Sequence, residues 1–366
     1  MSLNNSLLRL SPLLIFIAFT ACSHRSARPN SEEILILQSA MKNLSSEYSN
    51  PRLVTGELSV SVKNIFKLSN DALIESNQNK SIQDEQPPAL HIWSSDIRDY
   101  PTQRVLSEST IQPEPAHRFD DSEYGNQILY WNPLVQHEAD FTISRKFRYI
   151  TYDYRPDVDK VAERRHWNQI PQDILDNYTR VERFLEQDDA LIDTVFRLLE
   201  NIADPVSQAE AIYNWVQRSM TYIYPPEQRG VKNAFETLKG DCGQYSALFM
   251  TMCRIAGIPA RQQSGFNFVP ENTGAHVWSE IYLPVKGWVP VDATRKNGFL
   301  FLDNKRLITS IGLNIPLQHT PSWATFGNSE VEDSRTDFMQ MYTLASCGIE
   351  ATYSSTRRVL RSVELP

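Results

Sequence analysis

Cysteine is scarce in this chain of 366 residues, which holds only Cys22, Cys242, Cys253 and Cys347. Four widely spaced cysteines are too few for the disulfide framework of a small secreted domain. The cysteines show no C-x-x-C spacing, and the histidines show no H-x-x-x-H spacing. We therefore expect no metal site, and the sequence implies no cofactor.

An excess of positive charge is also lacking. The chain has 36 Lys and Arg against 44 Asp and Glu, a net charge of −8, and the two signs are interspersed. Nucleic-acid binders concentrate Lys and Arg on one face, so we expect no nucleic-acid partner. An apolar content of 41% is enough for a folded core, and the length suits two modest domains or one large one.

Long apolar runs are absent after the N-terminus, where LSPLLIFIAFTA has the length of a signal-peptide core and is too short to span a bilayer. The run ends in FTAC at Cys22, which resembles a bacterial lipobox. This resemblance implies cleavage before Cys22, acylation of its thiol and attachment to the cell envelope. Ser23 favours the outer membrane with the protein facing the periplasm, and an ordinary cleaved signal peptide is the alternative.

The N-terminal half carries the pattern of half-buried strands. Leu58, Val60 and Val62 alternate with polar residues, and this period of two predicts a strand. Further segments rich in β-branched and aromatic residues occur at 90–93, 126–132 and 140–153. Together these segments predict a β-sandwich-like N-terminal domain.

From residue 173 the apolar residues recur with the period of helices. The segment 205–220 has apolar residues three and four positions apart, and 241–256 ends at a Gly-Ile-Pro sequence that cannot continue a helix. Strand-like segments follow at 261–268, 276–283 and 287–293. Helices followed by hairpin-connected strands indicate an α+β fold rather than a doubly wound sheet.

These patterns divide the chain into five segments. We expect a lipoprotein signal peptide (1–21), a tether with a short helix (22–55), a β-rich N-terminal domain (56–165), a mixed helix and strand domain (166–310) and a C-terminal extension (311–366). Any chemistry is expected in the mixed domain, because the candidate residues described next lie there.

Cys242 stands at the first turn of the helix expected over 241–256. A thiol becomes a strong nucleophile only as the thiolate, and the partial positive charge of a helix N-terminus favours that anion. Asp241 is the expected N-cap, and the backbone N–H of Cys242 would point to where an oxyanion develops. Taken alone, Cys242 also fits a small buried apolar residue, so its interpretation depends on its partners.

A nucleophile needs a base, and the base needs an orienting group. His276 lies on one predicted strand and Asp292 on the next. The connection between the two strands is 284–287. A connection of three or five residues puts both side chains on the same side of the sheet, one diagonal step apart, whereas a plain four-residue loop gives the wrong parity and requires a bulge. The other histidines are expected to be surface or capping residues, namely His91, His117, His137, His166 and His319.

Three motifs in this order, GDCGQYSALFMTMCRIAGIPAR, AHVWSEIYLP and GWVPVDAT, resemble the transglutaminase-like superfamily. The resemblance is best from Ala209 to Thr294. It implies a papain-like α+β core with a catalytic triad, in which Cys242 is the nucleophile, His276 the general base and acid, and Asp292 the group that orients the imidazole.

The same resemblance implies a side chain upstream of the cysteine that binds the oxyanion. Three residues are candidates, Tyr222, Tyr224 and Asn233, and the sequence does not choose among them.

The implied reaction is thiolate attack on an amide or ester carbonyl to form a thioacyl enzyme. If water resolves the thioacyl enzyme, the protein is a cysteine peptidase or amidase. If a lysine amine resolves it, the protein is a cross-linking transglutaminase. We expect hydrolysis to be the main reaction, with transfer second. A lipid anchor would bring envelope proteins or peptides within reach. The alternative function is a membrane-tethered binding or assembly lipoprotein that keeps the fold without turnover.

Cys253 follows Cys242 by about three helical turns, or ~16 Å, which is too far for a disulfide between them. We expect Cys253 to be a buried core thiol. A bridge between Cys253 and Cys347 stays open, because the sequence does not show which residues are close in space.

Overall fold

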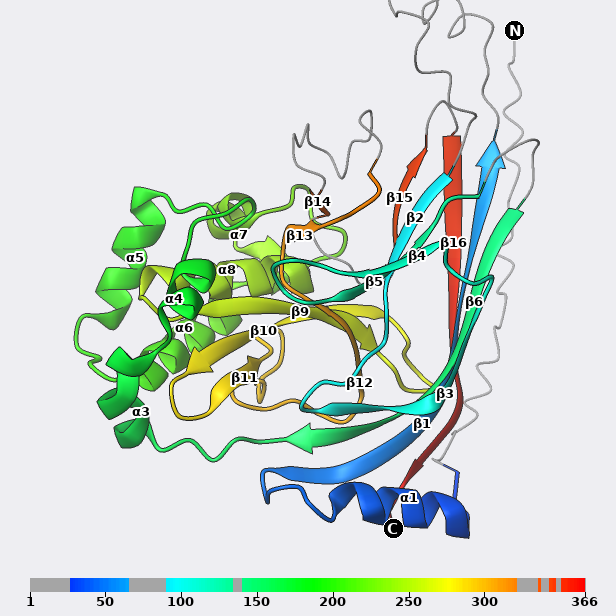
Figure 1. Cartoon of the computed structure of the whole chain (residues 1–366). Helices are drawn as coiled ribbons and strands as arrows, with labels where there is room; N and C mark the ends of the chain where they lie inside the picture. Colours follow the sequence, from blue (N-terminus) through cyan, green and yellow to red (C-terminus); the bar gives the residue numbers. More distant parts are fainter. Residues whose placement is uncertain are drawn as a thin grey trace, which may run out of the picture.

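The computed structural model in Figure 1 describes residues 27–65, 90–133, 140–320, 335–336, 342–346 and 350–365. The predicted signal peptide and lipidation site Cys22 lie outside these residues, and so does Cys347. Within the described ranges, no helix has the length and apolar character needed to cross a membrane.

The N-terminal strands, each set joined by one C-terminal strand, form two antiparallel sheets (Figure 1). The first sheet has the order β16-β1-β6-β3, with β1 (Tyr48–Ile65), β3 (Gln103–Gln112), β6 (Asp140–Tyr154) and β16 (Glu350–Glu364). The second has the order β15-β2-β5-β4, with β2 (Leu90–Ser95), β4 (His117–Asp120), β5 (Gln127–Trp131) and β15 (Tyr342–Ser346).

The two sheets share one apolar core. The alternating residues of β1 point into it, and Leu58, Val60 and Val62 are buried together with Leu129 of β5 and Phe147 of β6. Removing these side chains from water on both inner faces is what holds the sheets together. The predicted β-sandwich-like N-terminal domain is therefore confirmed.

Both chain ends differ in detail from the expected segments. A short helix, α1 (Ser31–Met41), is present and begins with a capping box between Asn30 and Glu33, but β1 already starts before residue 56. The expected C-terminal extension contains β16, which pairs along the length of β1. The last strand is thus part of the N-terminal sandwich rather than a separate addition.

The mixed region places helices beside a four-stranded sheet of order β11-β10-β9-β12 (Figure 1). The strands of this sheet are β9 (Ala260–Asn267), β10 (Ala275–Leu283), β11 (Gly287–Val291) and β12 (Arg306–Ile311). The helices are α3 (Lys160–His166), the 3-10 turn η1 (Trp167–Gln169), α4 (Gln172–Tyr178), α5 (Asp189–Leu199), α6 (Pro205–Ser219), α7 (Val231–Thr237) and α8 (Cys242–Ile255). This confirms the α+β class.

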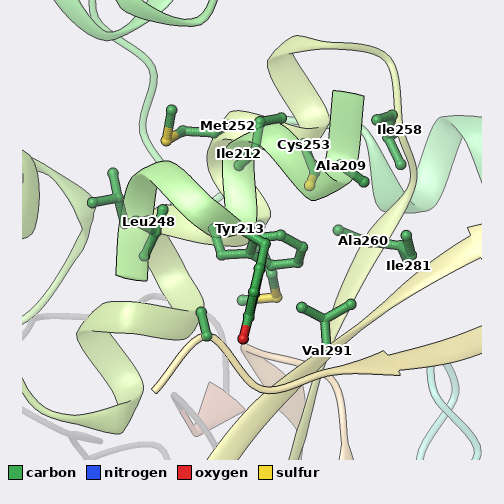
Figure 2. Packing of buried hydrophobic residues seen from close by; sticks show 14 of the residues in the cluster. Ala209, Ile212, Tyr213, Leu248, Met252, Cys253, Ile258, Ala260, Ile281 and Val291 are labelled. Carbon is green, nitrogen blue, oxygen red and sulfur yellow. The ribbon is translucent and has the colours of Figure 1, made fainter. Parts of the chain in front are cut away.

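The helix α8 is the centre of this region. Its side chains Leu248, Phe249 and Met252 are completely buried, against α6 on one side and the sheet on the other. Figure 2 shows Leu248, Met252 and Cys253 of α8 among residues of α6, β9, β10 and β11. A helix surrounded in this way cannot shift along its axis without opening the core, so its first residue has a fixed position.

The N-terminal sandwich is joined to the sheet of order β11-β10-β9-β12 at the outer edge of β12. The side-chain amide of Gln103 accepts from the N–H of Ile308 at 2.8 Å and donates to its carbonyl at 3.1 Å. Asn126 makes the same pair of bonds with Ile311, at 2.8 and 2.7 Å. Two buried amides therefore satisfy an edge that would otherwise carry unpaired backbone groups.

Replacing Gln103 by alanine removes both bonds to Ile308 and leaves a buried N–H and a buried carbonyl without partners. We expect the free energy of unfolding to fall by about 2–3 kcal/mol, measured by urea denaturation. The matched control is Gln127→Ala at an exposed strand position, which should change the value by less than ~0.5 kcal/mol. Equal effects of the two variants would contradict this role for Gln103.

Candidate active site

Cys242 is the first residue of α8, as the sequence predicted. The carboxylate of Asp241 caps the helix by accepting from the N–H groups of Gly243 at 3.0 Å and Gln244 at 3.2 Å. The amide of Gln244 then binds the preceding loop through the N–H of Gly230 and the carbonyl of Gln228, both at 2.9 Å. The nucleophile candidate is thus anchored from two sides.

The thiol of Cys242 lies against the strand that carries His276. The backbone N–H groups of Val277 and Gly243 lie close enough to the sulfur to lower the pKa of the thiol. Burial nevertheless raises the pKa of the Cys242 thiol to about 11, and the charges of Asp241 and Asp292 act in the same direction. Desolvation thus acts against the thiolate that the helix N-terminus is expected to favour, so a base is needed to remove the proton.

The hairpin between β10 and β11 brings His276 and Asp292 together. Leu283 pairs with Gly287, so the connection has three residues and needs no bulge. Gly287 has φ +77°, the left-handed conformation that closes this type of turn. His276 Nε2 lies 2.8 Å from Oδ2 of Asp292, as the parity argument for a three-residue connection predicted.

A buried carboxylate on α3 supports the turn between β10 and β11. Glu163 of α3 is completely buried and accepts from the backbone N–H of Val285 at 2.9 Å. Burial raises the pKa of Glu163. The turn that sets the register of the hairpin is therefore held from outside the hairpin as well.

The Asp292 carboxylate is bonded on both oxygens. Oδ1 accepts from the N–H of Thr294 at 3.1 Å and from its hydroxyl at 2.5 Å. Oδ2 accepts from Arg306 Nη2 at 2.9 Å in addition to its contact with His276, and Arg295 Nε lies 3.5 Å away. Burial acts to raise the pKa of Asp292, but the hydrogen bond and charge of His276, followed by the charge of Arg306, hold it well below its usual range.

Tyr222 is the upstream candidate that contacts the cysteine. It belongs to β7 (Thr221–Tyr222), which pairs in parallel with β8 (Lys239–Gly240) just before Cys242. Its side chain is 53% exposed, and its phenol lies near enough to Cys242 for the charges of the two groups to interact. Burial, followed by the charges of Cys242 and Asp241, raises the pKa of Tyr222 to about 12, so the phenol remains a proton donor at neutral pH.

The other two oxyanion candidates are placed differently. Tyr224 is 76% exposed, and Asn233 lies on α7. Of the three residues that the sequence left open, the structure brings only Tyr222 to the thiol.

Cys253 is a free, completely buried thiol inside the core, as expected. Three of the other described histidines, His91, His117 and His319, lie with the second N-terminal sheet rather than beside Cys242. His117 and His319 stack at 4.2 Å between ring centroids, and His91 Nδ1 lies 2.7 Å from the hydroxyl of Tyr130 in the second N-terminal sheet. Among the described residues, no three His, Cys, Asp or Glu side chains are grouped so that they could hold a metal ion.

The sequence reading missed Arg306. Nothing in its neighbourhood matches the three motifs, and β12 was not among the expected strands. A buried arginine beside the site cannot be recognised from spacing alone, because Arg306 reaches Asp292 only through the pairing of β12 with β9.

With this geometry established, comparison with known proteins places the domain. Residues 192–293 match the family model described as the transglutaminase-like superfamily. The matched segment contains Cys242, His276 and Asp292. Arg306 lies beyond it.

Two curated relatives illustrate the range of similarity. The uncharacterised protein YebA of Bacillus subtilis is 24% identical over 216 residues, which cover 52% of this chain and 28% of YebA. A protein-glutamine gamma-glutamyltransferase of Pseudomonas aeruginosa is 27% identical over 116 residues, which cover 25% of this chain and 17% of that protein. The chain thus spans less than a third of either relative.

A solved structure confirms the architecture. A candidate cysteine protease from Cytophaga hutchinsonii has a TM-score of 0.56, with 16% sequence identity over 84% of this chain and 92% of that one. At this identity the similarity concerns the fold, and it extends over both the sandwich and the mixed region.

A thiol with a raised pKa needs a base to become reactive, and we expect this base to be His276. We expect iodoacetamide to alkylate Cys242 of the wild type at pH 7.5, because proton transfer to the imidazole produces the thiolate. In His276→Ala the rate at pH 7.5 should fall at least about 30-fold, and it should keep rising with pH towards the thiol pKa of about 11. Peptide mass spectrometry gives the site and rate of labelling.

Cys253→Ala is the matched control for this experiment, because Cys253 is a free thiol on the same helix. It should label at Cys242 like the wild type. A His276→Ala protein that labels as fast as the wild type at pH 7.5 would contradict the role assigned to the imidazole.

Proposed function

We propose that this protein is a thiol-dependent acyl-transfer enzyme that acts on amide bonds of proteins or peptides, with Cys242, His276 and Asp292 as its catalytic triad. The observation that supports this most strongly is the His276–Asp292 contact of 2.8 Å, beside a thiol of Cys242 whose pKa responds to the backbone N–H of Val277 and to the charge of Asp292. A binding protein has no need for a buried His–Asp pair beside a buried thiol.

The first half of the reaction forms a thioester. His276 takes the proton of Cys242 on Nδ1, because its Nε2 is committed to Asp292. The thiolate attacks the amide carbon, and the negative charge moves to the carbonyl oxygen, which the N–H of Cys242 and the phenol of Tyr222 can stabilise. His276 then donates its proton to the leaving amine as the C–N bond breaks.

The second half consumes the thioester. Water, or the amine of a second substrate, attacks the acyl carbon while His276 accepts the proton of the attacking group. The C–S bond breaks, and the sulfur regains the proton from His276. We propose hydrolysis as the main outcome, which makes the protein a cysteine peptidase or amidase, with cross-linking through a lysine amine as the second outcome.

The site of action is also a proposal. The FTAC sequence at Cys22 supports a lipid anchor in the outer membrane with the protein facing the periplasm. Envelope proteins or peptides are then the substrates within reach. Palmitate labelling of the full chain, compared with Cys22→Ala, tests the anchor: loss of label in the variant is expected, and equal labelling would contradict it.

Tyr222→Phe tests the oxyanion assignment. Loss of the hydroxyl should lower kcat/KM towards a p-nitrophenyl ester about 10- to 100-fold, because one donor to the oxyanion is removed. The ring itself should remain in place, since Phe keeps its packing. Tyr224→Phe is the matched control at an exposed tyrosine, and its kcat/KM should stay within about twofold. Equal losses in both variants, or none in Tyr222→Phe, would contradict the assignment.

The partition between water and amine tests hydrolysis against transfer. With an acyl donor in H₂¹⁸O and millimolar lysine methyl ester, we expect most of the product to be the acid carrying one ¹⁸O atom. Mass spectrometry of the products measures the ratio. A predominance of the lysine amide would instead make the protein a transglutaminase. If neither the acid nor the amide forms, a tethered binding protein without turnover is favoured.

A further inference from the structure

Arg306 is a charged side chain that is only 2% exposed, at the start of β12. Its Nη2 donates to Oδ2 of Asp292 at 2.9 Å, and its Nη1 donates to Oδ1 of Asn267 on β9. Its guanidinium lies 5.4 Å from the ring centroid of Trp278, next but one to His276. A charge removed from water in this way needs a compensating partner, and that partner is Asp292.

We propose that Arg306 is a positioning residue of the triad, which keeps the carboxylate of Asp292 ionised and directed at Nε2 of His276. The proposal rests on the proposed function. Both Arg306 and His276 use the same oxygen, Oδ2, while Thr294 occupies Oδ1. The carboxylate therefore cannot rotate without losing bonds on both oxygens.

The charge of Arg306 acts on more than one member of the site. It interacts favourably with Asp292, Asp303 and the thiolate form of Cys242, and unfavourably with Arg295. Asp303 lies 3.6 Å from Nε of Arg306. Arg306 thus places a positive charge where both the ionised carboxylate and the attacking thiolate are stabilised by it.

The position of Arg306 depends on the N-terminal sandwich. β12 pairs with β9 on one side, and on its outer side the amides of Gln103 and Asn126 satisfy its backbone. Leu307, the residue after Arg306, packs in the core of the sandwich. The arginine that holds Asp292 therefore comes from β12, which lies outside the segment 192–293 and is held by the N-terminal sandwich.

The pH dependence of Cys242 alkylation tests this proposal in the full chain. In Arg306→Met, removal of the positive charge should raise the pH of half-maximal labelling by about one unit. The plateau rate should also fall about tenfold, because Asp292 is no longer held. Arg306→Lys restores a cation, so its half-maximal pH should return to within about 0.3 units of the wild type while its plateau stays low.

Arg254→Met is the control for a merely structural arginine. Arg254 is only 5% exposed and binds the carbonyl of Ala260 and Glu182 at the far end of α8 from Cys242. Its loss should lower stability without moving the half-maximal pH. If Arg306→Met does not fold, Arg306→Gln, which keeps an N–H donor, is expected to show the same upward shift.

Several results would overturn the proposal. They are an unchanged half-maximal pH in a neutral Arg306 variant, an equal shift in Arg254→Met, no recovery in Arg306→Lys, or the failure of both neutral variants to fold while Arg254→Met folds. Wild-type protein whose labelling does not depend on His276 would instead contradict the proposed function itself.

Discussion

The register of one hairpin is the constraint on which the rest of the site depends. Side chains on a strand alternate between two faces, so a shift of one residue between β10 and β11 would turn Asp292 away from His276. The three-residue turn closed by Gly287 sets the register, and Glu163 holds the turn from α3. Burial of β10 and β11 against α8 then fixes the distance between this pair and the helix that begins with Cys242.

At this site burial disfavours the charged forms of Cys242 and Asp292, whereas nearby hydrogen bonds and positive charges favour them. The backbone N–H groups of Gly243 on α8 and Val277 on β10 act to lower the pKa of the Cys242 thiol, but burial raises it to about 11. A thiol in such a place is inert unless a base is near. Asp292 is equally buried yet stays ionised, because His276 and Arg306 surround it with hydrogen bonds and positive charge. In the proposed mechanism, reactivity therefore requires these residues together.

The sequence predicted much of this arrangement and missed a definite part. Cys242 at a helix start, Asp241 as its cap, and His276 facing Asp292 follow from local periodicity and turn length, which are short-range properties. The roles of Arg306, Gln103 and Asn126 depend on pairings between strands that are far apart in the sequence. The pairing of β16 with β1 could not be read from the chain for the same reason, and neither could the net effect of burial on the Cys242 pKa.

Formation of a thioester on Cys242 is the central claim, and intact mass measurement after rapid acid quench tests it most directly. Incubated with a p-nitrophenyl ester, the wild type should gain the mass of one acyl group, located at Cys242 and removed by hydroxylamine. Cys242→Ala should gain none, and Cys253→Ala should behave as the wild type. An acyl group absent from the wild type, or present at the same level in Cys242→Ala, would contradict the account.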